Sequence, residues 1–316
     1  MPELTEWFHP KRRPGRTRLM MVGAFVGALV VLATSTLFSW PLGGLSAAAS
    51  NVAFEAPDGS CLMWTDGNDM NKVDCSASHL FEIAGTVDLA ASYPADAPFP
   101  DGTLWQKIVQ DNCTGVTARF MSNKLDPYGR YHTGALKPKD QQWAAGSRSM
   151  RCGLQVIGPG GKLLPATGSA TTGDQSAVYD VGTCLGIDGK SVSDPVPCDN
   201  AHAYEIVGIV DLKPLFPDGY PDQGKQDAAL SPACGKAATD YTKGYDLTKN
   251  GLGVTWDVVH QESWAIGSMK VNCKVGQKLP DGSGLQKIIN SVKGVGPQLV
   301  PSSTQAAPSS NPQDSH

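Results

Sequence analysis

The eight cysteines fall into two sets of four with the same internal spacing, and this pattern constrains the fold more than any other feature of the chain. In each set the first two cysteines are 14 residues apart, and the third lies 39 residues before the fourth. The sets are Cys61, Cys75, Cys113 and Cys152, then Cys184, Cys198, Cys234 and Cys273. Such self-similarity predicts two copies of one structural unit.

The residues around the cysteines repeat as well. Each set has a His and a Glu four and seven residues after its second cysteine, and a Trp nine residues before its last. These residues are His79, Glu82 and Trp143, then His202, Glu205 and Trp264. We therefore expect two homologous modules at residues 51–155 and 177–280, joined by a Gly/Pro/Thr/Ser-rich linker at 156–176.

Within each module the hydrophobic pattern predicts an α+β fold. Residues 81–88 alternate in polarity as a half-buried strand does, whereas apolar residues recur every three or four positions over 103–121, as in a helix. Asp101 or Thr103 can cap the start of that helix. The segment 143–152 is expected to be a closing strand. An Asp-Gly pair between the first two cysteines of each module favours a hairpin turn.

An uncharged apolar segment precedes the first module. Residues 19–40 number 22, and about 20 are needed to span a bilayer. Residues 1–18 carry five basic and two acidic side chains, a net charge of +3, so the positive-inside rule keeps them in the cytoplasm. We expect a signal anchor in the plasma membrane with the bulk of the chain extracytoplasmic. A cleaved signal peptide is the alternative, because Ala47-Ala48-Ala49 resembles a cleavage site.

Composition excludes other classes of protein. The net charge of the 316 residues is −4, which argues against a nucleic-acid binder held by phosphate contacts. With a single long apolar segment, the chain is not a multi-spanning transporter. Residues 281–316 are expected to form a short helix followed by a disordered Pro/Ser-rich tail.

In an oxidising compartment the eight cysteines are most simply four structural disulfides. Four cysteines per module allow three pairings, and we favour first with second and third with fourth. The expected bonds are Cys61–Cys75, Cys113–Cys152, Cys184–Cys198 and Cys234–Cys273. The alternative is a metal site at Cys75, His79 and Glu82 and its repeat, but zinc requires thiolates that oxidation removes. No metal or other cofactor is expected.

The repeated His–Glu pair is the strongest candidate for chemistry, since a His base can be oriented by a carboxylate. Residues three apart on a strand point to opposite faces, so His79 and Glu82 share a site only if His79 precedes the strand. The interpretation we favour is that both pairs brace the start of the strand beside a disulfide. Trp143 and Trp264 are expected to pack the core, although an exposed Trp could anchor a partner.

The repeated pattern G-x-C…V-x-C-x-x-x-H-x-x-E-I-x-G-x-V-D-L, then a lone Cys on a helix, then W-A-x-G-S-x-x-x-x-C, resembles the actinobacterial septum formation family. It begins at Gly59 and again at Gly182. The second copy departs from the family pattern where Met269 replaces Arg148, which puts a shared role of that arginine in doubt. The resemblance implies a membrane-anchored exported protein connected with cell division or envelope growth, and it implies no catalytic residue.

The function we expect is that of a non-enzymatic, single-pass membrane protein whose two modules bind an envelope or cell-division protein. No catalytic triad or zinc-protease motif is present in the sequence. Two alternatives remain open: an exported cell-wall enzyme that uses the His–Glu pairs, and an envelope ligand sensor.

Overall fold

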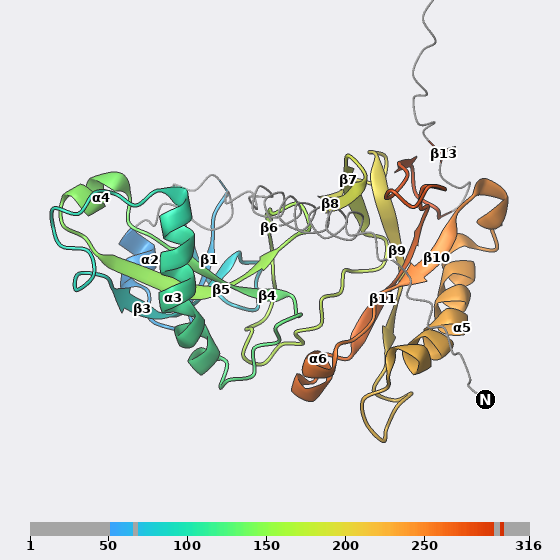
Figure 1. The fold of residues 1–316 in the computed structure, drawn as a ribbon, viewed down its shortest axis with the longest axis horizontal. Helices are drawn as coiled ribbons and strands as arrows, with labels where there is room; N and C mark the ends of the chain where they lie inside the picture. The colour runs from blue at the N-terminus through green and yellow to red at the C-terminus, as the bar shows by residue number, and fades with distance from the viewer. Residues whose placement is uncertain (1–50, 66–68, 294–297, 300–316) are drawn as a thin grey trace, which may run out of the picture. The chain divides into compact units, whose positions relative to one another are not determined.

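The computed structural model describes residues 51–65, 69–293 and 298–299 (Figure 1). The expected cytoplasmic segment at 1–18, the anchor at 19–40, the turn at Asp66-Gly67 and the end of the tail lie outside these residues. Within the described ranges, no helix has the length and apolar character needed to cross a membrane. We call residues 51–176 the first half and the described residues from 177 onward the second half.

The first half is built on an antiparallel sheet in the order β2-β1-β3-β5-β4, with β6 added beside β5. Its strands are β1 (Cys61–Met63), β2 (Asn71–Val73), β3 (Phe81–Asp88), β4 (Tyr131–Leu136), β5 (Ser149–Ile157) and β6 (Leu163–Leu164). Its helices are α2 (Asn51–Glu55), α3 (Gly102–Phe120) and α4 (Asp140–Ala144).

Helix α3 covers one face of this sheet and contacts β3, β4 and β5 (Figure 1). Asp101 caps it, because its Oδ1 accepts a hydrogen bond of 2.8 Å from the Leu104 amide. The buried face of the helix carries Trp105, Ile108 and Cys113 among others. The expected strand at 81–88 and a helix near 103–121 are thus confirmed, but the first five residues of β3 are all buried rather than alternating.

The second half repeats the strand order as β8-β7-β9-β11-β10 and adds β12 and β13. Its strands are β7 (Cys184–Asp188), β8 (Ser191–Val196), β9 (His202–Asp211), β10 (Gly253–Trp256), β11 (Lys270–Gly276), β12 (Ile288–Ile289) and β13 (Gln298–Leu299). Its helices are α5 (Gln223–Thr242), a 3-10 turn η2 (Thr248–Asn250) and α6 (Gln261–Ile266). Helix α5 contacts β9, β10 and β11.

The four disulfides have the pairing that the sequence predicts. Cys61–Cys75 and Cys184–Cys198 clamp the first hairpin of each half, and Cys113–Cys152 and Cys234–Cys273 join the long helix to the central sheet. The Cα–Cα distances of 5.2–5.3 Å are normal for disulfides. The protein is therefore of mixed α/β composition with two disulfide-braced antiparallel sheets.

Two segments predicted to lie outside the sheets, a linker and a short helix, instead contribute strands to them. The expected linker at 156–176 contains the end of β5 and the strand β6, and Ala166 and Ala170 within it are buried. The short helix expected within 281–316 was wrong, because Ile288 lies in β12 and pairs with His202. Small or branched apolar residues in these segments pack into the core. Composition alone does not reveal this packing.

The closing strand expected at 143–152 was also partly wrong. Trp143 lies in helix α4, and the strand begins only at Ser149. Gly146, with a φ of 92°, breaks the chain direction between the two elements.

Candidate functional site

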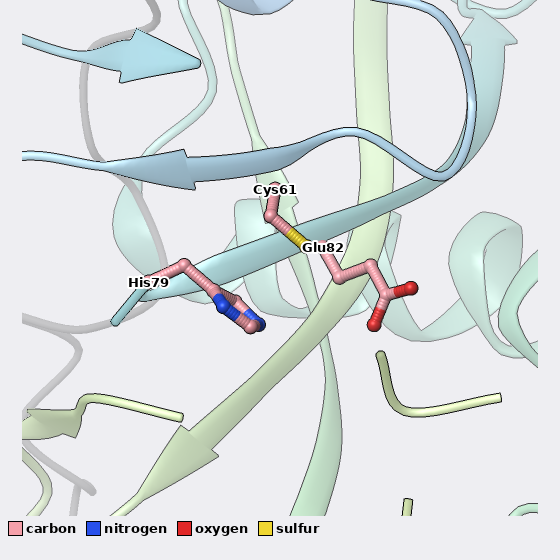
Figure 2. A group of neighbouring side chains, drawn as sticks. All are labelled: Cys61, His79 and Glu82. Atoms are coloured by element: carbon pink, nitrogen blue, oxygen red, sulfur yellow. The ribbon is translucent and has the colours of Figure 1, made fainter. Parts of the chain in front are cut away.

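The structure brings His79 and Glu82 to the same region beside the Cys61–Cys75 disulfide. His79 precedes β3 and forms an isolated bridge with Ala166, while Glu82 is the second residue of the strand. Both side chains are buried. Figure 2 shows them on the same side of β3, with the Glu82 carboxylate directed away from the imidazole and toward a neighbouring segment of coil.

That coil segment provides the partners of the Glu82 carboxylate. Ser169 Oγ donates to Oε1 at 2.6 Å, and the Ala170 amide donates to Oε2 at 2.7 Å. The side chain is only 2% exposed. A buried carboxylate needs such donors to offset its loss of hydration, so Glu82 holds the returning chain against the sheet.

The imidazole of His79 is also engaged by the backbone. Its Nδ1 lies 3.0 Å from the carbonyl oxygen of Ala77, in the turn that precedes β3. Because a carbonyl oxygen only accepts, Nδ1 carries the proton and donates this hydrogen bond. His79 thus braces the turn, and its hydrogen bond is not to Glu82.

The second half uses Glu205 in the same way. Its carboxylate accepts hydrogen bonds of 2.6 Å each from Tyr241 Oη, Ser291 Oγ and the Val292 amide. Glu205 is 0% exposed. Burial, together with the hydrogen bond to Glu205, raises the pKa of Tyr241 to about 12, so the phenol stays a donor throughout the physiological range.

His202 corresponds to His79, and its Nδ1 donates to the Asn200 carbonyl at 2.8 Å. Burial lowers the pKa of His202, which keeps the ring neutral. Its Nε2 is buried and has no hydrogen-bond partner in the described part of the chain. In both halves the His side chain therefore supports the turn that leads into the central strand.

The segments that the two carboxylates hold have the same local structure. We call residues 166–170 the first strap and residues 288–292 the second strap. The first residue of each strap pairs with the His, the third has a positive φ (82° and 68°), and the last two donate to the Glu. The matched residues are Ala166, Gly168, Ser169 and Ala170, and Ile288, Asn290, Ser291 and Val292.

Sequence reasoning missed both straps and Tyr241. The signal was present: a residue tolerant of positive φ, then Ser, then a small or branched apolar residue follows the last cysteine of each set. Extending the alignment of the two halves beyond Cys152 and Cys273 finds it only with a gap of one residue, because Ser169 lies 17 residues after Cys152 and Ser291 lies 18 residues after Cys273.

Sulfur, imidazole and carboxylate ligand atoms meet at this site. Those of Cys61, His79 and Glu82 lie within 4.8 Å of one another, as do those of Cys184, Cys198 and Glu205. All three cysteines are in disulfides, and a disulfide sulfur is not the thiolate that zinc binds. In the oxidised protein the first cluster therefore offers one imidazole and one carboxylate that is already hydrogen-bonded.

The two predicted tryptophans differ in environment. Trp143 is buried among Tyr93, Phe99 and Trp105, and its Nε1 donates to the Ala97 carbonyl at 2.8 Å. Trp264 is partly exposed.

Arg148 explains part of this difference. Its guanidinium lies over the Trp143 ring, 3.8 Å from the centroid, and donates to five backbone carbonyls. Met269 at the matching position can make none of these hydrogen bonds, so the arginine serves the first half alone.

These features define a class of protein: a disulfide-braced, mixed α/β chain in which each sheet has a buried glutamate that holds a C-terminal strap. The model of the septum formation family matches residues 58–273, and the chain belongs to this family. That match runs across both halves as one span.

Two curated relatives are uncharacterized membrane proteins of Mycobacterium tuberculosis, from strains CDC 1551 / Oshkosh and ATCC 25618 / H37Rv. Each is 35% identical over 246 residues, which cover 75% of this chain and 55% of the relative. The chain thus spans about half the length of the relatives it matches. No solved structure matches it.

Proposed function

We propose that the protein is a membrane-anchored, extracytoplasmic scaffold that binds an envelope or cell-division protein through two homologous modules. Membership in the septum formation family indicates a septum-related role, and the relatives' names indicate membrane association. The apolar segment at 19–40, preceded by basic residues, supports a single anchor with the modules outside the cell.

The observation that carries a binding role, rather than a catalytic one, is how the His–Glu pairs are used. Both carboxylates accept hydrogen bonds from a strap, and both His Nδ1 atoms donate to turn carbonyls. A general base must reach a substrate proton. Glu82 and Glu205 would have to release their straps to do so.

The test separates bracing from chemistry with His79→Asn and His202→Asn. The asparagine amide nitrogen occupies nearly the position of the His Nδ1 and donates as it does, but it cannot act as a base. In cells of the native host depleted of the protein, we expect the doubly substituted full chain to restore septum formation. The same chain without residues 51–293 is the matched negative control.

The rival function, a cell-wall enzyme, predicts the opposite result. A doubly substituted protein that folds and reaches the envelope at normal levels, yet leaves septation defective, would contradict the scaffold proposal. In the same strain, a photo-crosslinking residue at exposed Tyr220 should capture a division or envelope protein. Crosslinks to many different envelope proteins, with no enrichment at the septum, would also contradict the scaffold proposal.

A further inference from the structure

A cavity of about 430 Å³ lies beside the second sheet and is lined by residues of both halves. The first half contributes the turn after α3, with Asp126 and Tyr128. The second half contributes residues of α6, β9 and β11 and of the Trp-Ala-x-Gly-Ser segment, including Ser268. None of the His–Glu residues lines this cavity, so it is separate from the site described above.

Asp126, in the wall of this cavity, has one acceptor without a partner among the described residues. The residue is 2% exposed, and its Oδ1 accepts 2.9 Å hydrogen bonds from the Tyr128 amide and from Ser263 Oγ. Its Oδ2 is buried with no hydrogen-bond partner among the residues that the structure describes. A buried acceptor left in this state is costly unless a donor reaches it.

The cations that line the cavity do not supply that donor. Lys270 Nζ lies 2.7 Å from Asp174 Oδ2, and Lys274 is bound to Asp257. Each lysine therefore already has a carboxylate partner. The Oδ2 of Asp126, unpartnered among the described residues, is the acceptor that a ligand with an ammonium group would match.

Ser268, in the wall of the same cavity, has a second polar group without a partner in the part of the chain that the structure describes. It is 3% exposed, and its Oγ has no hydrogen-bond partner in the described ranges. The side chain of Asn272, which also lines the cavity, is held in place, because its amide exchanges hydrogen bonds of 2.8 and 2.9 Å with the backbone of Tyr179. Asp126 and Ser268 thus each bring to the wall of the cavity one buried polar atom that has no partner among the described residues.

The rest of the wall is aromatic and apolar. The Tyr128 ring stacks on His260 with centroids 3.9 Å apart, and Tyr204, Leu185 and Val271 also line the cavity. Flat apolar surface beside a few polar groups is typical of sites for small organic ligands.

We propose that this cavity binds a small primary amine, whose ammonium group donates to Asp126 Oδ2 and whose neighbouring polar group bonds to Ser268 Oγ. Amino sugars and amino-acid amides both have this chemistry in a molecule small enough for the cavity. The inference does not depend on the scaffold role, because a protein can bind such a ligand with or without a protein partner.

The two candidate ligand classes, amino sugars and amino-acid amides, are each tested with one amine and a matching compound that lacks the amine. Glucosamine is compared with glucose, and alaninamide with propionamide, by saturation-transfer NMR and calorimetric titration on the purified full-length chain. We expect at least one amine to bind with a millimolar or lower Kd. Its amine-free counterpart should bind at least about tenfold more weakly, and the pair that shows the difference identifies the source.

The repeated architecture supplies matched variants. Asp126→Asn should weaken amine binding at least about tenfold and Ser268→Ala by severalfold. Asp246 is in a similar turn of the second half, where it accepts from the amide two residues ahead, but its side chain is 45% exposed. Asp246→Asn, and Ser147→Ala in the first Trp-Ala-x-Gly-Ser segment, should leave binding unchanged.

Three results would overturn the proposal. One is that no amine binds the folded chain, which would mean that only water occupies the cavity. Another is equal binding of amines and their counterparts. The third is unchanged binding in Ser268→Ala, which keeps the proposal falsifiable even if Asp126→Asn does not fold.

Discussion

Removing the Glu205 carboxylate should detach the second strap from the sheet. In Glu205→Ala three donors lose their acceptor at once: the Tyr241 hydroxyl, the Ser291 hydroxyl and the Val292 amide. The two hydroxyls can rotate toward other acceptors, but the Val292 amide is fixed in the backbone and buried. The substitution therefore affects the strap more than the rest of the half.

The size of the effect follows from the kind of hydrogen bond that is lost. A hydrogen bond to a charged group contributes about 1.5–3 kcal/mol, and a buried donor left unpaired costs about 1–3 kcal/mol. Because the three bonds share one acceptor, their contributions do not add. We expect Glu205→Ala to lower the free energy of unfolding by about 3–5 kcal/mol, and Glu82→Ala, with two donors, by about 2–4 kcal/mol.

Urea unfolding measures these losses, and hydrogen exchange locates them. The Val292 amide should exchange much faster in Glu205→Ala than in the unsubstituted chain. Amides in the core of β9 should still exchange only through global unfolding. Glu262→Ala, at an exposed position of α6, is the control and should change stability by no more than about 0.5 kcal/mol.

A specific outcome would refute this reasoning. If Glu205→Ala and Glu262→Ala were equally stable, or if the Val292 amide stayed as protected as in the unsubstituted chain, the carboxylate would not hold the strap. The assignment of the His–Glu pairs to bracing would then have no energetic basis.

Three further outcomes are expected. Burial lowers the pKa of His202 below its usual 6.5. The neutral ring therefore contributes stability that is complete above about pH 6.5 and is lost as the pH falls through the lower pKa of the folded state. Unfolding titrations of His202→Ala should lack this loss in acid, yet show about 1–3 kcal/mol less stability at neutral pH because the Asn200 carbonyl loses its donor. The pKa of Tyr241 is raised to about 12 from 10.0, so its contribution is complete below pH 10 and is lost toward pH 12; Tyr241→Phe should abolish that alkaline loss, and an unchanged pH profile would contradict the hydrogen bond to Glu205. Arg148→Met introduces the residue found at the matching position of the second half. It should lower the free energy of unfolding in urea by about 3–5 kcal/mol, because five carbonyls lose their donor. A loss under about 1 kcal/mol would show that the guanidinium does not stabilise the fold.

The sequence predicts those parts of the fold that a local pattern or a strict spacing encodes. Helical spacing over 103–121 reflects one face packed on a core, and cysteine spacing limits the possible disulfides to a few. Alternation located the strand at 81–88, although its first five residues are buried on both faces. The site is less accessible. The sequence shows that His79 and Glu82 can share a site only if His79 precedes the strand. It does not show the partner of Glu82, because Ser169 lies 87 residues away in a segment without periodicity.

The straps were hidden by their composition. Ala166, Gly168 and Ser169 are residue types common in flexible linkers, and only the sheet beside them turns them into a packed segment. Likewise, the apolar residues from Leu285 to Val292 fit a helical period as well as a short strand, because a run this short does not distinguish the two. Tertiary contact, rather than local preference, decides both segments.

The position of each strap has a consequence for the order of events during synthesis. A chain emerges from its N-terminus, and domains generally fold in that order. Cys61–Cys75 and Cys113–Cys152 can therefore close, and α3 can cover its sheet, while the donors for Glu82 are still unmade. Each sheet receives its last hydrogen bonds from residues that follow its final cysteine, so each half finishes folding late. The first half therefore completes its hydrogen bonds only when the beginning of the second half is being synthesised.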